Sequence, residues 1–268
     1  MKKSNIKIFA SDLDGTLLND KKEISSLTLE AVKRVKEENK MFIITTGRPY
    51  GEYVQNLKDK LNLNNDYVVV FNGAMVYYGQ ELIYSCPLSK QDIKDLDEFA
   101  SHFNVNTHIF TTDNELHIKE SNKYSNFVGE TNKSIIHYGD YNFKEDAIKF
   151  SIVADDDIIK DVINNIPDSF KKRFNIFRSY GFLLEFVNIN VDKINAIKDI
   201  CKKTNTSIDE VMTFGDEEND YHMVEQAGIV VTPLNGRDKL KKVAKIVCDD
   251  CNNSGVAKVI LEYLGKDK

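Results

Sequence analysis

The sequence contains little of the chemistry that marks membrane, fibrous or disordered proteins. Tryptophan is absent, and the 268 residues include only 4 prolines, 13 glycines and 4 cysteines, while 41% are hydrophobic. The longest apolar runs, such as residues 67–71, are far too short to cross a bilayer. This composition is typical of a globular protein with a sizeable core, arranged as one large domain or two smaller ones.

An excess of positive charge is also absent. The chain has 36 Lys and Arg against 42 Asp and Glu, a formal net charge of −6 at pH 7. Because affinity for a phosphate backbone comes from clustered basic residues, we expect no nucleic-acid partner. The short basic runs 171–173 and 239–242 are typical of solvated faces. The first residues contain no apolar stretch of signal-peptide length, so we expect a cytoplasmic protein without membrane contact.

The four cysteines do not form a recognisable metal-binding pattern. Cys248 and Cys251 make a single Cys-x-x-Cys, but no second pair and no histidines at ligand spacing follow. A structural zinc site would need such additional ligands. We therefore interpret this pair as a feature of a loop.

The order of apolar segments predicts a parallel sheet that is interrupted by a second module. Residues 6–11 and 41–45 are strand-like, and residues 26–39 between them have helical spacing of apolar positions. Such a strand–helix–strand unit requires a right-handed crossover and implies parallel strands. The same alternation resumes at residues 192–264, whereas residues 85–187 have the mixed pattern of an α+β module.

The predicted fold class is therefore α/β. We expect a doubly wound, Rossmann-like parallel sheet formed by residues 1–84 and 188–268. Residues 85–187 would form an inserted α+β domain.

Polar residues follow the predicted parallel strands at four places. They are Asp12-Leu13-Asp14-Gly15-Thr16, Thr46-Gly47-Arg48, Asn72-Gly73 and Gly215-Asp216-Glu217-Glu218-Asn219-Asp220. Because ligands of an open parallel sheet gather at the carboxyl ends of its strands, we expect these groups to converge. Carboxylates so close together repel one another unless a cation lies among them, and hard oxygen ligands favour Mg²⁺. Carboxylate-bound Mg²⁺ with open positions is a phosphate site.

A calcium loop is the alternative for the first of these segments. Asp12, Asp14 and Glu23 occupy positions 1, 3 and 12 of the calcium-loop template. The glycine that the template requires at position 6 is replaced by Leu17, and a strand precedes the loop where the template has a helix. The calcium reading is therefore disfavoured.

In this order, the four segments resemble the motifs of the haloacid dehalogenase superfamily. Within that superfamily they look like the Cof-like phosphatases, which carry a large α/β cap, and Gly255-Val256-Ala257 adds to the similarity. The resemblance covers the whole chain. It implies that residues 1–84 and 188–268 form the catalytic core and that residues 85–187 form a cap that determines substrate specificity.

The resemblance also implies roles for the acidic residues and one lysine. Asp12 would be the nucleophile that forms an aspartyl-phosphate, and Asp14 would be the general acid and base. Asp12, Asp216 and the backbone carbonyl of Asp14 would bind Mg²⁺, with Asp220 orienting these ligands. Lys193 would add positive charge beside the transferring phosphoryl group.

The phosphate-binding residues implied by the resemblance are Thr46, Gly47 and Asn219. Arg48 lies beside them in the sequence and is assigned no chemical role. Asn72-Gly73 is interpreted as a turn between core and cap. The family often has glycine where this chain has Ile194, and Pro233-Leu234 replaces a turn of small residues.

The implied function is a magnesium-dependent phosphatase of small phosphorylated metabolites. Sugar phosphates are the first candidates, and nucleotides, flavin phosphates and pyridoxal phosphate stay open. Two alternatives also remain: a sugar phosphomutase of the same superfamily, and a phosphometabolite sensor that binds without turnover. We expect a monomer or a weak homo-oligomer.

Overall fold

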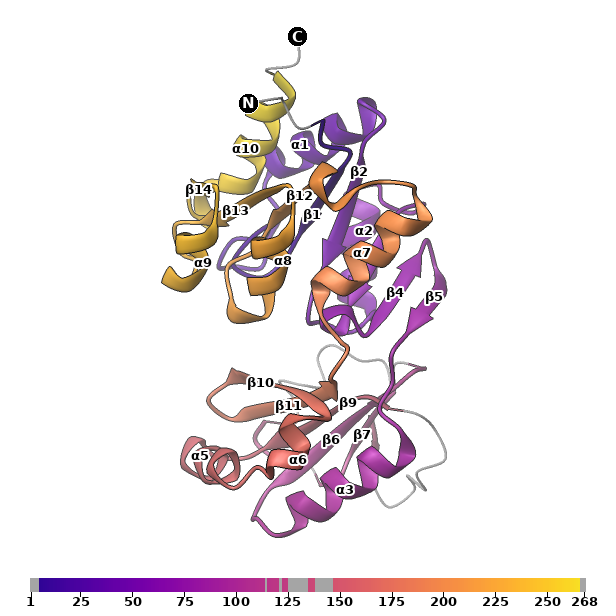
Figure 1. Ribbon diagram of the computed structural model, residues 1–268, viewed down its shortest axis with the longest axis vertical. Helices are drawn as coiled ribbons and strands as arrows, with labels where there is room; N and C mark the ends of the chain where they lie inside the picture. The colour runs from indigo at the N-terminus through magenta and orange to yellow at the C-terminus, as the bar shows by residue number, and fades with distance from the viewer. Residues whose placement is uncertain (1–4, 114, 121, 125–134, 138–146, 266–268) are drawn as a thin grey trace. The chain divides into compact units, whose positions relative to one another are not determined.

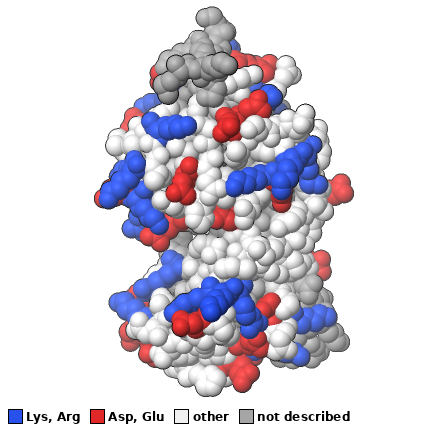
Figure 2. Space-filling view, viewed as in Figure 1, with Lys and Arg blue, Asp and Glu red and all other residues white. Residues whose placement is uncertain are grey.

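The structure is a computed structural model that describes residues 5–113, 115–120, 122–124, 135–137 and 147–265. None of the described helices is long and apolar enough to span a membrane. On the face shown in Figure 2, basic and acidic side chains are interspersed.

The chain forms two compact units. The first contains residues 1–47, 56–83 and 192–268, and the second contains residues 48–55 and 84–191. Residues 48–55 therefore group with the second unit, although they were expected in the first. The functions of the two units as catalytic core and cap stay predictions.

The first unit is built on an eight-stranded sheet with the order β14-β13-β12-β1-β2-β3-β4-β5 (Figure 1). Its strands are β1 (Ile8–Ser11), β2 (Met41–Thr45), β3 (Tyr67–Val70), β4 (Met75–Tyr78), β5 (Glu81–Ser85), β12 (Val211–Phe214), β13 (Ile229–Pro233) and β14 (Ile246–Cys248). All pairs from β14 through β3 are parallel, and β4 is antiparallel to β3. The chain winds outward from β1 in both directions, so β1 lies at the switch point where ligands of such sheets bind.

Helices connect these strands. They are α1 (Ser26–Glu37), α2 (Glu52–Lys60), α7 (Lys193–Lys203), α8 (Tyr221–Gln226), α9 (Asp238–Val243) and α10 (Gly255–Gly265), with short 3₁₀ turns η1 (Phe71–Gly73), η3 (Ile208–Glu210), η4 (Glu218–Asp220) and η5 (Cys251–Asn253). Helix α1 begins where the Ser25 hydroxyl accepts the Thr28 amide at 3.1 Å, which satisfies one free donor. It packs against α10, whereas α8 packs against both α7 and α9 (Figure 1).

The second unit is a six-stranded sheet with the order β10-β11-β9-β6-β7-β8. Its elements are α3 (Lys90–Ser101), β6 (Asn106–Thr111), β7 (Leu116–Ile118), β8 (Ile135–His137), β9 (Ala147–Val153), α5 (Asp156–Asn164), α6 (Asp168–Lys171), β10 (Phe174–Tyr180) and β11 (Leu183–Asn188). Alternate residues of the strands, among them Phe150 and Phe186, form a buried core with Leu96 of α3 and Ile159 of α5. Neighbouring strands are antiparallel apart from β7 and β8.

The predicted fold class is confirmed, and the differences lie in short elements. Strand β8 and helix α6 were not predicted, because three or four residues are too few to display a period. The helical segment that follows β12 is divided into η4 and α8. Its first turn is distorted because the Asp220 carboxylate binds the amides of residues 216 and 217.

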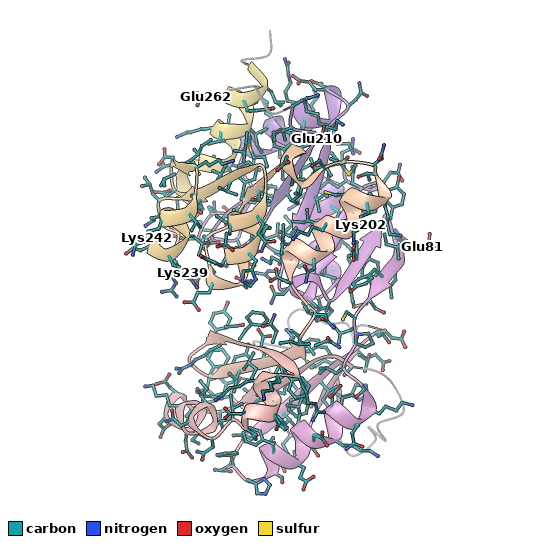
Figure 3. All side chains as sticks on the ribbon, in the orientation of Figure 1. Glu81, Lys202, Glu210, Lys239, Lys242 and Glu262 are labelled. Carbon is teal, nitrogen blue, oxygen red and sulfur yellow. The ribbon has the colours of Figure 1, made fainter. Side chains whose placement is uncertain are left out.

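The basic run 239–242 lies on α9 with its charged side chains toward solvent. Lys239 and Lys242 project outward in Figure 3, and Leu240 between them is buried. This arrangement agrees with the interpretation of the run as a solvated face.

Candidate active site

Asp12 lies directly after the central strand β1. Its amide donates to the carbonyl of Phe214 at 3.0 Å, which continues the pairing of β1 with β12 by one residue. Every residue of β1 is buried, as expected for a strand covered on both faces. The Asp12 side chain is therefore presented at the carboxyl edge of the sheet from a rigid support.

Three carboxylates gather at this edge. Asp12, Asp216 and Asp220 each offer an oxygen, and these oxygens lie within 4.8 Å of one another. Burial, followed by repulsion from Asp220, raises the pKa of Asp216 to about 7. Burial and the neighbouring carboxylates also raise the pKa of Asp12, although Lys193 opposes this. The cluster therefore holds more negative charge than its surroundings stabilise.

Lys193 lies among these carboxylates. It is the first residue of α7 and is fully buried, and its Nζ donates to Asp12 Oδ1 and to Asp220 Oδ1, each at 2.6 Å. Helix α7 begins here because the Asp192 side chain accepts the Ile194 amide at 3.0 Å. Burial alone would lower the pKa of Lys193, but the two carboxylates outweigh it and raise the pKa, so the lysine stays charged.

The donor set fits a divalent cation. When all three carboxylates are ionised, Lys193 balances only one of them and two negative charges remain. Asp220 Oδ2 also accepts hydrogen bonds from the backbone amides of Asp216 at 3.0 Å and Glu217 at 3.2 Å. Its two oxygens are therefore engaged by Lys193 and by the loop after β12. Asp12 and Asp216 are the pair suited to bind a hard cation such as Mg²⁺.

Asp14 lies apart from this cluster. Its carboxylate pairs with Lys22 at 2.9 Å and is 33% exposed, so the structure does not place it among the buried acids. The turn that follows Asp14 packs directly against Asp216 at Gly15. A Cβ on Gly15 would lie only 2.3 Å from Asp216 Oδ2. Only glycine allows this close approach with a φ of +78°.

The predicted phosphate-binding residues meet at Asn72. Gly47 packs so closely on Asn72 that an added Cβ would lie 3.0 Å from its Oδ1. Asn219 Nδ2 donates to the same Oδ1 at 2.9 Å, and the backbone carbonyl of Thr46 accepts the Asn72 amide at 2.9 Å. Asn72 lies in the turn η1, which agrees with its interpretation as a turn residue, and its side chain makes these contacts in addition. Its position directly after a parallel strand was the available signal.

Two further residues support the site: Thr16, which belongs to the first polar segment of the sequence, and Asn235, to which no role was assigned. Thr16 Oγ1 donates to Asp216 Oδ1 at 2.6 Å. Asn235 Nδ2 donates to the carbonyl of Gly15 at 2.7 Å, so the loop after β13 holds the turn that follows Asp14. No local signal in the sequence predicts the contact between Asn235 and Gly15, because the two residues are 220 positions apart.

Comparisons with known proteins agree with this arrangement. A Streptococcus pyogenes protein named "Putative phosphatase" is 30% identical, over 97% of this chain and 99% of that protein. The Bacillus subtilis 5-amino-6-(5-phospho-D-ribitylamino)uracil phosphatase YitU is 27% identical, over 96% and 97%. The crystal structure of a haloacid dehalogenase-like hydrolase from Bacteroides thetaiotaomicron matches with a TM-score of 0.85 and 26% identity, over 96% and 99%. A model of the haloacid dehalogenase-like hydrolase family matches residues 9–260, and the chain therefore belongs to this family.

Proposed function

We propose that the protein is a magnesium-dependent phosphatase of small phosphorylated metabolites, with Asp12 as its nucleophile. The observation that carries the proposal is the buried cluster of Asp12, Asp216 and Asp220 around Lys193. Burial of three carboxylates around one lysine lowers the stability of the folded protein, unless a cation binds to the carboxylates and offsets their repulsion. Family membership supports a hydrolase, and relatives named as phosphatases support the phosphate ester as its substrate class.

In the first half-reaction, a carboxylate oxygen of Asp12 attacks phosphorus and the ester P–O bond breaks. Asp14 gives its proton to the leaving oxygen, so the alcohol departs neutral. In the second half-reaction, Asp14 takes a proton from water as that water attacks the aspartyl-phosphate. Inorganic phosphate leaves and Asp12 is restored. Asp14 is suited to this exchange because its carboxylate is partly open to solvent.

The remaining site residues bind the phosphoryl group and orient it toward Asp12. Lys193 donates to Asp12 and would stabilise the charge that develops on the phosphoryl group. Thr46, Gly47 and Asn219 bind phosphoryl oxygens. Asp12, Asp216 and the backbone carbonyl of Asp14 would hold Mg²⁺, which would polarise a phosphoryl oxygen and lower the repulsion between the phosphoryl group and the Asp12 carboxylate.

We assign the selection of substrates to residues 85–187 of the second unit. For the substrate class we propose phosphorylated sugars and polyols. The name of the Bacillus subtilis relative specifies a phosphorylated ribityl chain as the substrate of that protein, which supports this class.

The test is phosphate release by the purified protein. We expect release from p-nitrophenyl phosphate and from members of a sugar-phosphate and polyol-phosphate panel, with Mg²⁺ present and no bisphosphate activator added. EDTA should abolish the release and added Mg²⁺ should restore it. Asp12→Asn should reduce kcat by at least about 10⁴-fold, because the amide is a poor nucleophile.

Three results would contradict the proposal. Substantial activity of Asp12→Asn would exclude Asp12 as the nucleophile. Transfer of the phosphoryl group within a sugar, with little free phosphate, would indicate a mutase. Binding of phosphate esters without release from any member of the panel would indicate a sensor.

A further inference from the structure

The backbone of η1 is unusual at three consecutive residues. Phe71, Asn72 and Gly73 have φ angles of +49°, +58° and +103°. Left-handed φ values are easy for glycine, acceptable for asparagine and unfavourable for a bulky residue such as phenylalanine. For residues other than glycine, such conformations persist where the surrounding structure imposes them.

The run touches three segments that carry predicted site residues. Asn72 contacts Gly47 on one side and accepts from Asn219 on another. Gly73 lies against the start of α7, since an added Cβ would be 2.5 Å from the carbonyl oxygen of Asp192, the residue before Lys193. The left-handed backbone thus places one side chain between the loop after β2 and the loop after β12.

The other left-handed asparagines provide a comparison. Asn39, Asn62 and Asn205 have φ angles of +55°, +55° and +50°, and each lies two residues past the end of an α-helix. All three are exposed, and this position is a common one for a residue that ends a helix. Asn72 does not follow an α-helix and is only 7% exposed. Its tolerance of the backbone conformation alone does not account for its buried amide contacts.

We propose that Asn72 is a positioning residue for the transferred phosphoryl group: its side chain fixes the Asn219 carboxamide and spaces it from the Thr46–Gly47 loop. This inference rests on the proposed phosphatase function. By accepting one Nδ2 hydrogen of Asn219, Asn72 sets the plane of that amide and directs its second hydrogen. An amide that is already oriented loses less entropy when it binds phosphate.

The test uses Asn72→Gly, which keeps the left-handed backbone and removes only the side chain. If Asn72 were merely a turn residue, glycine would replace it without loss. We expect the Ki of inorganic phosphate, as a competitive inhibitor, to rise about tenfold. The KM for p-nitrophenyl phosphate should rise by a similar factor while kcat falls less than about threefold, because the lost binding is common to ground and transition states.

Two further variants make the result specific. Asn205→Gly is the matched control, and its kinetics should equal those of the wild type. Asn219→Ala should raise the Ki of phosphate at least as much as Asn72→Gly does. The double variant Asn72→Gly/Asn219→Ala should be no worse than Asn219→Ala alone, because Asn72 acts through Asn219.

Different failures identify different errors. A Ki for Asn72→Gly equal to that of the wild type would overturn the positioning role and leave the phosphatase function intact. Additive effects in the double variant would do the same, because they would make Asn72 independent of Asn219. If the wild type neither hydrolyses p-nitrophenyl phosphate nor binds phosphate, both the proposed function and this inference are wrong.

Discussion

Each of the two units buries charged side chains, but the balance of charge differs between them. In the first unit, three carboxylates share one lysine at the ends of strands. In the second unit, Lys149 of β9 pairs with Glu185 of β11 at 2.5 Å within the sheet, one charge against one. In a buried pair of opposite charges the net charge is zero, whereas a cluster with excess negative charge needs a further cation to neutralise it. An excess of buried charge of one sign therefore indicates a binding site more clearly than the burial of charged residues alone.

Among the effects that test this comparison, the largest is expected from removing one buried lysine of each unit, Lys193 or Lys149. Lys193→Met should lower kcat/KM for p-nitrophenyl phosphate by about 10²–10³-fold, because an electrostatic contact with the reacting group is lost. Lys149→Met should leave this activity within about threefold while it lowers stability by about 3–5 kcal/mol, because Glu185 stays buried without its partner. Kinetics below the melting temperature and denaturant unfolding measure the two effects. Equal losses of activity in both variants would contradict the claim that only the buried lysine of the first unit serves a binding site.

A smaller effect is expected on the pH dependence of stability, and it comes from a buried histidine of the second unit. His108 of β6 lies beside Ser151 of β9, which in turn is paired with Glu185. Among the described residues, neither ring nitrogen of His108 has a hydrogen-bond partner. Burial, with a contribution from Lys149, lowers the pKa of His108 from 6.5 to about 4. The native protein therefore holds His108 neutral where the unfolded chain protonates it.

The sign of the pH effect follows from this difference. Between pH 6.5 and about 4 the unfolded state binds more protons at His108, so stability falls as the pH falls through this window. The full loss from this residue is about 3 kcal/mol. His108→Gln should reduce that slope, measured by urea unfolding at a series of pH values. A slope identical to that of the wild type would show that His108 is not held neutral.

The smallest effect is stabilisation by the cation. Mg²⁺ at about 100 times its Kd should stabilise the first unit by about 2.7 kcal/mol, because it binds the native state only. Asp216→Asn should lose most of this stabilisation, and Lys149→Met should retain it. Thermal unfolding with and without Mg²⁺ measures the difference. Equal stabilisation of wild type and Asp216→Asn would place the cation elsewhere.

Much of the fold could be predicted because its signals are local. Strand β2 begins and ends at the predicted residues, since it is a short and largely buried run between Lys40 and Thr46. The rule that parallel strands present their carboxyl ends together was enough to group Asp12 with Asp216. The functions assigned to these residues stay predictions.

The contacts that support the site could not be predicted in the same way. Asn219 and Asn72 are 147 residues apart, and their hydrogen bond depends on a left-handed backbone that no sequence period signals. The pairing of Asp14 with Lys22 is local, but it depends on the path of the loop between them. Packing of distant loops determines such contacts, and it is visible only in three dimensions.

The most direct test is to find where the phosphoryl group resides during turnover. Wild-type protein mixed with p-nitrophenyl phosphate and Mg²⁺, quenched in acid and digested, should yield a phosphorylated peptide that contains Asp12, and Asp12→Asn should yield none. Phosphate release without any phosphorylated Asp12, or with the phosphoryl group on another residue, would contradict the account.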